Sequence, residues 1–212
     1  SLFAQKGWNT VYFTNHDHSR AVSKFGNDAP AFREPSAKML YTCLLTQRAT
    51  PYLYWGDEIG MTNIRFKNLS DYNDLATHNT YKLLEKTSKV KADAFLASQA
   101  ELGRDNSRTP MQWNDGTNAG FTTGKPWLTI NPNYTGINVA AAEKDPNSIL
   151  NYMRKMIRLR NDNKEVLVYG KYTLLDKMNK QVYSYTREAN GRKMLVLLNF
   201  SSTAATANTG LD

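Results

Sequence analysis

Residues 9–17 read NTVYFTNHD, a run of β-branched and aromatic residues that ends directly in three polar ones. Such a run favours extended structure, so the sequence predicts a short buried strand over residues 8–14. A β/α barrel builds its active site at the carboxyl ends of its strands. The stretch therefore predicts a barrel strand that delivers His16 and Asp17 to a site.

The residues after this strand complete a βαβ pattern. Residues 20–33 contain Gly, Asn, Asp and Pro and are expected to form a loop. A helix is predicted over about 34–48, because its apolar residues recur at helical spacing and Pro35 suits a first turn. Residues 51–54 then read as a second short strand. Strand, helix and strand in this order predict a parallel strand pair.

A long excursion separates this unit from the next periodic segment. Residues 59–134 contain one expected helix, over about 91–102, and are otherwise rich in Asn, Gly, Thr, Pro and Trp. A loop of this length inside a compact domain is usually functional. It carries a second polar segment, GRDNSRTPMQW, at residues 103–113. A further helix is predicted over about 148–161, where apolar residues follow a 3.6-residue period.

Beyond Lys164 the apolar pattern changes to a period of two, which predicts strands. Asn190 and Gly191 fit a two-residue hairpin turn. The expected strands span residues 166–175, 182–187 and 193–199. These strands predict a small antiparallel β-domain. Because they are few for a stable sheet domain, further sequence is expected after Asp212.

Composition argues against several classes of partner. The chain has 27 basic and 19 acidic residues and a net charge of +8. The basic residues are scattered over helices, without an arginine-rich arm or a nucleic-acid module, so we predict no nucleic-acid partner. No apolar run approaches the ~20 residues that span a bilayer, so we predict no membrane segment. The single cysteine, Cys43, cannot form an internal disulfide and is expected to be a buried small hydrophobe.

The first residues carry no signal-peptide pattern, because residues 1–6 lack an apolar core. The chain begins with Ser1 rather than methionine, and so abrupt a beginning is consistent with truncation. The missing export signal therefore leaves the compartment open, with the cytoplasm slightly favoured.

Local sequence supports two interpretations of His16 and Asp17. Glycoside cleavage passes through a cationic, oxocarbenium-like state flanked by carboxylates, which Asp17 can stabilise while His16 holds a hydroxyl. Alternatively, Asp17 is a strand-end aspartate that caps the next turn. The two interpretations weigh about equally on these residues alone.

Arg104 and Arg108 also have two interpretations. Either arginine can pair with an active-site carboxylate, keep it ionised and reach sugar hydroxyls. Either can instead belong to a salt-bridge network that folds the long loop. We assign Arg108 to that network in preference to Arg104, and keep Arg108 as a possible substrate contact.

Aromatic and acidic residues near these motifs are further candidates. Trp55, Phe121 and Trp127 can stack on sugar faces, although a single aromatic residue more often packs in a core. Asp57 and Glu58 are expected to tie loops together rather than to contact substrate. The remaining histidines lack metal-ligand spacing, so no metal or other cofactor is predicted in this segment.

Three long motifs resemble the α-amylase superfamily, glycoside hydrolase family 13. They are the triplet at 15–17 followed by Arg20, TPYLYWGDEIGMTN at 50–63, and RDNSRTPMQW at 104–113. Shorter matches extend the similarity over nearly the whole chain, at residues 118–122, 126–134 and 168–170. The chain is most similar to the oligo-1,6-glucosidase, α-glucosidase and sucrose isomerase group.

The resemblance implies an α/β fold, a (β/α)₈ TIM barrel followed by an antiparallel β-domain. The chain would hold the C-terminal part of the barrel over residues 1–164 and the start of the β-domain over 165–212. Members are retaining enzymes with an Asp nucleophile, a Glu general acid/base and a second Asp that stabilises the transition state. Asp17 matches that stabilising Asp, His16 a hydroxyl-binding His, and Arg104 an Arg that contacts the sugar in the first subsite.

The resemblance also implies what this segment lacks. The nucleophile, the general acid and the family's calcium loop have no matching motif in it. The segment is therefore expected to need the N-terminal part of the same barrel and to be inactive alone. The implied activity of the complete protein is hydrolysis of α-glucosidic bonds in a short oligosaccharide or disaccharide. A sucrose isomerase or transglucosylase, and a non-catalytic family member, are the alternatives.

The chain departs from its group at two places. Where the group usually has Tyr-Gln-Gly-Glu-Glu, residues 54–58 read YWGDE. Where a Pro often follows the Asn-His-Asp triplet, this chain has His18 and Ser19. Both changes flank the expected pocket, so they leave the linkage and acceptor preferences open.

Overall fold

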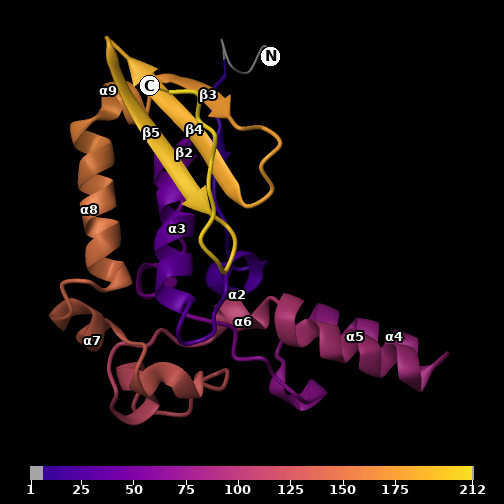
Figure 1. Cartoon of the computed structure of the whole chain (residues 1–212). Coiled ribbons are helices and arrows are strands. Elements are labelled where there is room, and N and C mark those ends of the chain that lie inside the picture. Colours follow the sequence, from indigo (N-terminus) through magenta and orange to yellow (C-terminus); the bar gives the residue numbers. More distant parts are fainter. Residues whose placement is uncertain (1–6, 212) are drawn as a thin grey trace. The chain divides into compact units, whose positions relative to one another are not determined.

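The computed structural model describes residues 7–211, and Figure 1 labels its elements. Residues 1–6, where the sequence shows no signal-peptide pattern, and residue 212 lie outside the described residues. The chain divides into two compact units. The sheet unit comprises Ser1–Tyr12, Pro35–Tyr52 and Tyr152–Asp212, and the loop unit comprises Phe13–Glu34 and Leu53–Asn151.

The sheet unit contains the predicted parallel strand pair. β1 (Thr10–Val11) pairs in parallel with β2 (Thr50–Pro51), with Thr10 opposite Thr50. The parallel pairing is confirmed, but the predicted strand lengths are wrong, because each strand has two residues and β1 is not buried. Each strand has one strand partner among residues 7–211, so few ladder hydrogen bonds hold the flanking residues extended.

The two predicted long helices on either side of the excursion are confirmed as α3 (Arg33–Thr46) and α8 (Ile149–Asp162). Within the sheet unit, the buried Arg160 of α8 donates to the carbonyl oxygens of Leu45 and Ala49, at 2.7 and 2.6 Å. Carbonyls at the end of a helix lack helical partners. Arg160 therefore closes the C-terminal end of α3.

The predicted antiparallel sheet is confirmed, with the strand order β3-β4-β5 (Figure 1). Its strands are β3 (Lys171–Leu175), β4 (Val182–Ala189) and β5 (Arg192–Asn199). Asn190 and Gly191 have φ values of 52° and 72°, which a two-residue hairpin turn of the primed type requires. Sequence reasoning was wrong at the start of the first strand, since α9 (Lys164–Leu167) occupies it. Val166 and Leu167 are adjacent and both buried, which an alternating strand with one buried face does not permit.

One face of this sheet carries the core of the sheet unit. Tyr185, Val196 and Leu198 are buried, and Met39 and Cys43 of α3 pack against them. Cys43 is partly buried rather than fully buried, and burial raises the pKa of its thiol. The thiol lies among apolar side chains, as predicted for a small hydrophobe, and also accepts a hydrogen bond from Gln47 Nε2 at 3.9 Å.

The loop unit is built from short helices joined by irregular segments. Its α-helices are α2 (Ala21–Phe25), α4 (Leu75–Glu85), α5 (Lys89–Leu102), α6 (Asp105–Arg108) and α7 (Val139–Lys144). Its 3₁₀ turns are η1 (Asp57–Ile59), η2 (Leu69–Asp71), η3 (Thr117–Gly120) and η4 (Pro132–Thr135). The predicted helix at 91–102 is confirmed as α5. The prediction of a loop over 20–33 was wrong at α2, whose Ala21 and Val22 are buried, so packing overrides weak local propensity there.

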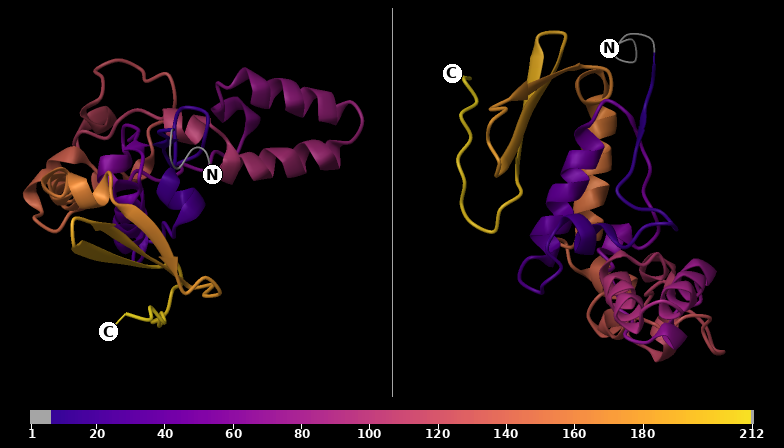
Figure 2. Two further views of the ribbon diagram at one scale, coloured as in Figure 1. Left: turned by 90° about the horizontal axis from the view of Figure 1, so that it is seen from above. Right: turned by 90° about the vertical axis from the view of Figure 1, so that its right-hand side faces the viewer.

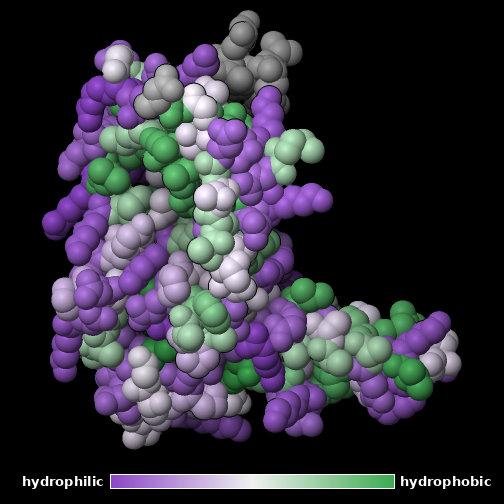
Figure 3. All heavy atoms as spheres, viewed as in Figure 1, coloured by the Kyte–Doolittle hydropathy of each residue, from purple (hydrophilic) through white to green (hydrophobic). Residues whose placement is uncertain are grey.

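The helices α4 and α5 run side by side as an antiparallel hairpin (Figure 2). Asp74 caps α4 by accepting from the amides of Ala76 and Thr77, and Ser88 caps α5 by accepting from the amide of Lys91. Apolar side chains on this hairpin lie exposed among polar ones (Figure 3). The exposed apolar residues of α4 and α5 include Leu75, Leu83, Val90 and Leu102. Within residues 7–211, no helix has both the length and the apolar character of a bilayer span.

Gly56 fixes the turn that carries residues 54–58. Its φ is +89°, in the left-handed region that glycine adopts without a Cβ penalty. A Cβ at this position would lie 2.6 Å from Arg20 Nη1, which itself donates to the Trp55 carbonyl at 2.6 Å. Arg20 is fully buried, and its guanidinium lies over the Trp55 ring, 4.6 Å from the ring centroid. The turn thereby holds Trp55 against the side chain of Arg20.

Candidate active site

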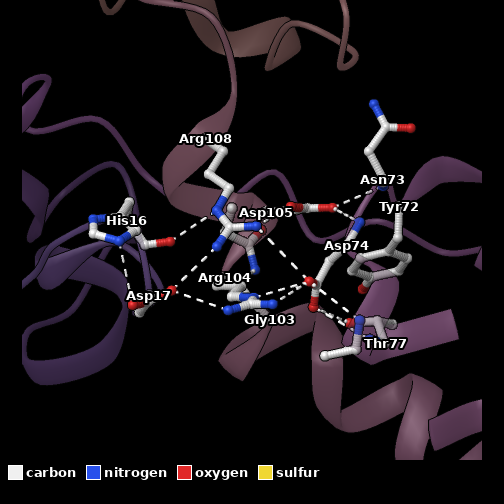
Figure 4. Close-up of polar contacts among 12 residues, drawn as sticks. His16, Asp17, Tyr72, Asn73, Asp74, Thr77, Gly103, Arg104, Asp105 and Arg108 are labelled. Atoms are coloured by element: carbon white, nitrogen blue, oxygen red, sulfur yellow. Dashed lines mark hydrogen bonds and ion pairs between the residues drawn. The ribbon is translucent and has the colours of Figure 1, made fainter. Parts of the chain in front are cut away.

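Asp17 belongs to a charged network in the loop unit, in which Arg104 and Arg108 lie between it and two further aspartates (Figure 4). Its Oδ1 accepts from Arg104 Nη1 at 3.0 Å and from Arg108 Nη2 at 3.2 Å. Its Oδ2 lies 3.3 Å from His16 Nε2. The side chain remains half exposed, at 49%. Asp17 is therefore held by cations on one side while another part of its carboxylate is open to solvent.

Arg104 is anchored by a buried aspartate. Its Nε and Nη2 donate to Asp74 Oδ1 at 2.9 and 2.6 Å. The other oxygen of Asp74 accepts from the hydroxyl and the amide of Thr77, at 2.9 and 3.2 Å, in the first turn of α4. Asp74 is thus both the helix cap of α4 and the acceptor that aims the rest of the Arg104 guanidinium at Asp17.

Arg108 is likewise held by a buried aspartate, Asp105. Its Nη1 donates to Asp105 Oδ1 at 3.3 Å, and its Nε donates to the His16 carbonyl at 2.8 Å. Asp105 has no exposed surface, and its Oδ2 accepts from the amides of Asn73 and Asp74, both at 2.8 Å. The buried carboxylate of Asp74 thus directs Arg104 toward Asp17, and that of Asp105 directs Arg108, whose Nη1 also lies 3.8 Å from Asp74 Oδ1.

The network keeps Asp17 ionised. Burial acts to raise the pKa of Asp17, but the hydrogen bond from Arg104 and the charges of His16, Arg104 and Arg108 outweigh it and lower the pKa. At Asp74, burial is likewise outweighed by hydrogen bonds from Arg104 and Thr77, and the pKa is lowered. Both groups are anionic at neutral pH, and the negatively charged carboxylate of Asp17 is half exposed to solvent. Such a group can stabilise a cation without attacking it.

We expect Arg104→Met to raise the pKa of both Asp17 and Asp74, because it removes a hydrogen bond and a positive charge from each. Since the folded-state pKa values are depressed, these contacts stabilise the fold above the ordinary Asp pKa of 3.8 and are lost as the pH falls through the depressed values. Carboxyl ¹³C NMR titration of the complete protein that contains this chain measures both values. Arg158→Met, at an exposed position of α8, is the matched control. Unchanged Asp17 and Asp74 titrations in Arg104→Met would contradict the network.

A groove of about 440 Å³ adjoins this network. It is lined by Trp55, Trp113, Phe121 and Trp127, together with Glu58 and Arg108, and we call it the aromatic groove. Its four rings are 37–56% exposed. Arg108 belongs to both the groove and the network around Asp17. This volume lies within the range of about 300–1,000 Å³ that is typical of small-molecule sites.

The structure brings together most of the residues that the sequence singled out. His16, Asp17, Arg104 and Arg108 share one network, and Trp55 and Phe121 line the adjoining groove with Trp127. Their roles toward a substrate stay predictions. Both arginines take part in the salt-bridge network, although we had assigned Arg108 to it in preference to Arg104.

Two acids next in sequence differ in how they are used. Asp57 is buried and accepts from the Tyr54 amide at 3.2 Å, as a loop-tying residue should. Glu58 lines the groove instead. Within residues 7–211, no group of three or more His, Cys, Asp or Glu side chains is arranged to hold a metal ion.

Sequence reasoning missed Asp74 and Trp113. Asp74 had a local signal, since an aspartate three residues before Thr77 at the start of a helix is a cap pattern. That pattern predicts the cap of α4 but not the contact with Arg104. Trp113 stood inside a quoted motif without a role of its own.

Comparisons with known proteins match this geometry to a family. A model of the α-amylase catalytic domain matches residues 1–170. The chain is 47% identical over 196 residues to the oligo-1,6-glucosidase of Parageobacillus thermoglucosidasius, and 48% identical over 198 residues to that of Bacillus cereus. Each alignment covers 92% of this chain but 34% and 35% of the relatives, so the chain spans about a third of their length.

A solved structure gives the same result. An isomaltulose synthase mutant from Erwinia rhapontici NX5, in complex with sucrose, is 49% identical and superimposes with a TM-score of 0.90. The match covers 93% of this chain and 35% of that protein. The predicted fold class is thereby confirmed: the chain holds the C-terminal part of a TIM barrel followed by a small antiparallel β-sheet.

Proposed function

Because the chain belongs to the α-amylase catalytic-domain family, we propose that it forms part of a retaining α-glucosidase acting on short α-glucosides. The observation that carries the proposal is the state of Asp17. It is ionised, held by two arginines and half exposed beside His16. A carboxylate of this kind suits the cationic transition state of glycoside cleavage.

The proposed roles follow from charge and position. Asp17 stabilises the positive sugar as the glycosidic bond breaks, through a charge that is already in place before the reaction. His16 and Arg104 hold sugar hydroxyls and orient the ring, and positioning of this kind supplies much of the rate in such chemistry. Arg108 holds Asp17 and is a possible substrate contact with Trp55 and Phe121.

The nucleophile and the general acid are assigned to no residue of this chain. We propose that residues 1–164 belong to the catalytic barrel and 165–212 to the β-domain, and that the N-terminal part of the barrel supplies the other two carboxylates. A single stabilising carboxylate provides neither a covalent intermediate nor a proton for the leaving group. The 212-residue chain alone is therefore expected to be inactive toward α-glucosides.

The test is product analysis with the complete enzyme that contains this chain. With isomaltose as substrate, ¹H NMR of the first-formed glucose should show the α-anomer, because double displacement retains configuration. First-formed β-glucose would exclude a retaining mechanism. Absence of turnover on all α-linked glucose disaccharides would favour a non-catalytic family member.

A second candidate is a sucrose isomerase or transglucosylase. It is supported by sequence identity, because the chain is 49% identical to an isomaltulose synthase and 47–48% identical to two oligo-1,6-glucosidases. The two activities differ in whether water or a held sugar receives the glucosyl group. On sucrose, isomaltulose or trehalulose as product would identify the isomerase, whereas glucose and fructose would identify the hydrolase.

A further inference from the structure

Asn106 is a buried amide inside the polar segment that carries both arginines of the network. It belongs to α6, two residues after Arg104 and two before Arg108, and it has no exposed surface. Its hydrogen-bond partners lie within the loop unit. A side chain that is already fully enclosed in this unit does not depend on contacts with any further part of the complete protein.

The amide oxygen of Asn106 holds a strained piece of backbone. It accepts from the amides of Ile64 and Arg65, both at 3.1 Å. Arg65 has a φ of 58°, in the left-handed region that costs free energy for a residue with a Cβ. Such a conformation persists where the surrounding contacts over-determine it. Two of those contacts come from one oxygen atom, which fixes residues 64–65 and α6 to each other.

The amide nitrogen of Asn106 closes the C-terminal end of α5. Its Nδ2 donates to the carbonyl oxygens of Gly103 and Ala100, at 2.9 and 3.2 Å. The last carbonyls of a helix lack helical partners, so these bonds satisfy groups that the helix cannot. The backbone carbonyl of Asn106 in turn accepts from Nε of the buried Arg20 at 3.3 Å. One residue therefore joins three segments of the loop unit.

The helix α6 is too short to hold its own position. It has four residues and no side-chain cap, and an isolated helical turn is unstable in water. Its place is therefore set by the side chains that tie it to its surroundings, of which Asp105 and Asn106 are fully buried. Arg104 and Arg108 flank these two residues and contact the same oxygen of Asp17, at 3.0 and 3.2 Å. A shift of α6 would move both arginines at once.

We propose that Asn106 is a positioning residue for the reaction, whose side chain fixes α6 so that Arg104 and Arg108 hold Asp17 in place. The proposal rests on the proposed glucosidase function. Because it is fully buried, Asn106 cannot touch a substrate, and it acts through the two arginines alone.

The test replaces Asn106 in the complete enzyme. Asn106→Ala removes every side-chain bond, whereas Asn106→Ser is milder because it keeps a hydroxyl group. Both variants should lower kcat on isomaltose, Asn106→Ala about a hundredfold and Asn106→Ser about tenfold, because a misplacement of about 1 Å can lower a rate a hundredfold.

The titration of Asp17 gives a readout that a general loss of stability would not move. Asp17 faces His16, Arg104 and Arg108, which lower its pKa. Displacement of the two arginines should raise the pKa of Asp17 toward the ordinary Asp value of 3.8. Carboxyl ¹³C NMR titration of the variants in the complete enzyme measures the rise.

Asn138→Ala is the matched control, because Asn138 is also a buried asparagine that joins backbone segments of the same unit. Its Nδ2 donates to the Tyr134 carbonyl and its Oδ1 accepts from the Ala141 amide, both at 2.8 Å. The control should lower the thermal midpoint, as the Asn106 variants do. It should leave kcat and the pKa of Asp17 at their wild-type values.

The outcomes separate this proposal from the one on which it rests. An unchanged pKa of Asp17 in Asn106→Ser, whatever happens to kcat, would overturn the positioning role. An equal rise in Asn138→Ala would overturn it as well. A wild-type enzyme that cleaves no α-linked glucose disaccharide would overturn the proposed function, and the titration of Asp17 would still decide whether Asn106 positions the arginines.

Discussion

Asp17→Asn should lower kcat on isomaltose by about a thousandfold in the complete enzyme, the upper part of the range for losing one preorganised electrostatic contact. Asparagine has the same shape and keeps an acceptor oxygen for Arg104, so the pocket should not collapse. It lacks the negative charge, however. Arg104 and Arg108 would then face the cationic sugar without a compensating anion, 3.0 and 3.2 Å from the position of the lost carboxylate oxygen.

Single-turnover kinetics with isomaltose measure this change. Asp115→Asn, at an exposed position of the same unit, controls for the loss of one negative charge and should keep wild-type kcat. The thermal midpoint of Asp17→Asn should remain close to wild type, because the side chain is half exposed. Near-normal turnover by Asp17→Asn would remove Asp17 from the mechanism, whatever the substrate proves to be.

The largest effect on stability is expected from Asp105→Ala. Asp105 is fully buried, accepts two backbone amides at 2.8 Å and pairs with Arg108. Its removal leaves the amides of Asn73 and Asp74 without their acceptor and removes the ion pair that Arg108 makes with Asp105. Removal of one partner from a buried charged pair costs about 3–5 kcal/mol, so the free energy of unfolding should fall by about that amount.

Urea unfolding of the complete protein that contains this chain measures the fall, with Asp115→Ala as the control for an exposed aspartate. Hydrogen exchange gives a local readout that a general loss of stability would not mimic. The amides of Asn73 and Asp74 should lose protection in native conditions before those of α3 do. A loss below about 1 kcal/mol, with these two amides still protected, would show that Asp105 does not anchor the network.

Elements with a strong repeating pattern were predictable from sequence. Helices α3, α5 and α8 begin and end within about two residues of their predictions, because apolar spacing and caps mark them locally. The hairpin turn was predictable for a similar reason, since Asn190 and Gly191 tolerate the positive φ that the turn demands. In contrast, α9 buries the adjacent residues Val166 and Leu167 together. A segment this short that is buried on both sides shows neither the helical nor the strand period in its apolar residues.

The site was predictable in its residues but not in its construction. The motifs that contain Asp17 and Arg104 stand 87 positions apart and meet in one ion pair. Asp74 escaped prediction because its partner Arg104 is 30 positions away, and because the helix that it caps carries a run of weak helix formers at residues 77–80. Contacts between residues so far apart in sequence depend on how residues 59–134 fold back. The spacing of apolar residues does not predict them. The linkage and acceptor preferences were left open by the changes at residues 54–58 and at His18 and Ser19, and two of the residues at 54–58, Trp55 and Glu58, line the aromatic groove.

The bond between Arg104 and Asp74 has a consequence for how this region can vary. Asp74 precedes α4 and Arg104 follows α5, so their ion pair closes the base of the helical hairpin. The geometry at Asp17 depends on this closure and on Thr77, which holds the Asp74 carboxylate, rather than on the far end of the hairpin. Insertions in the connecting turn at 86–88 should therefore leave the network around Asp17 undisturbed.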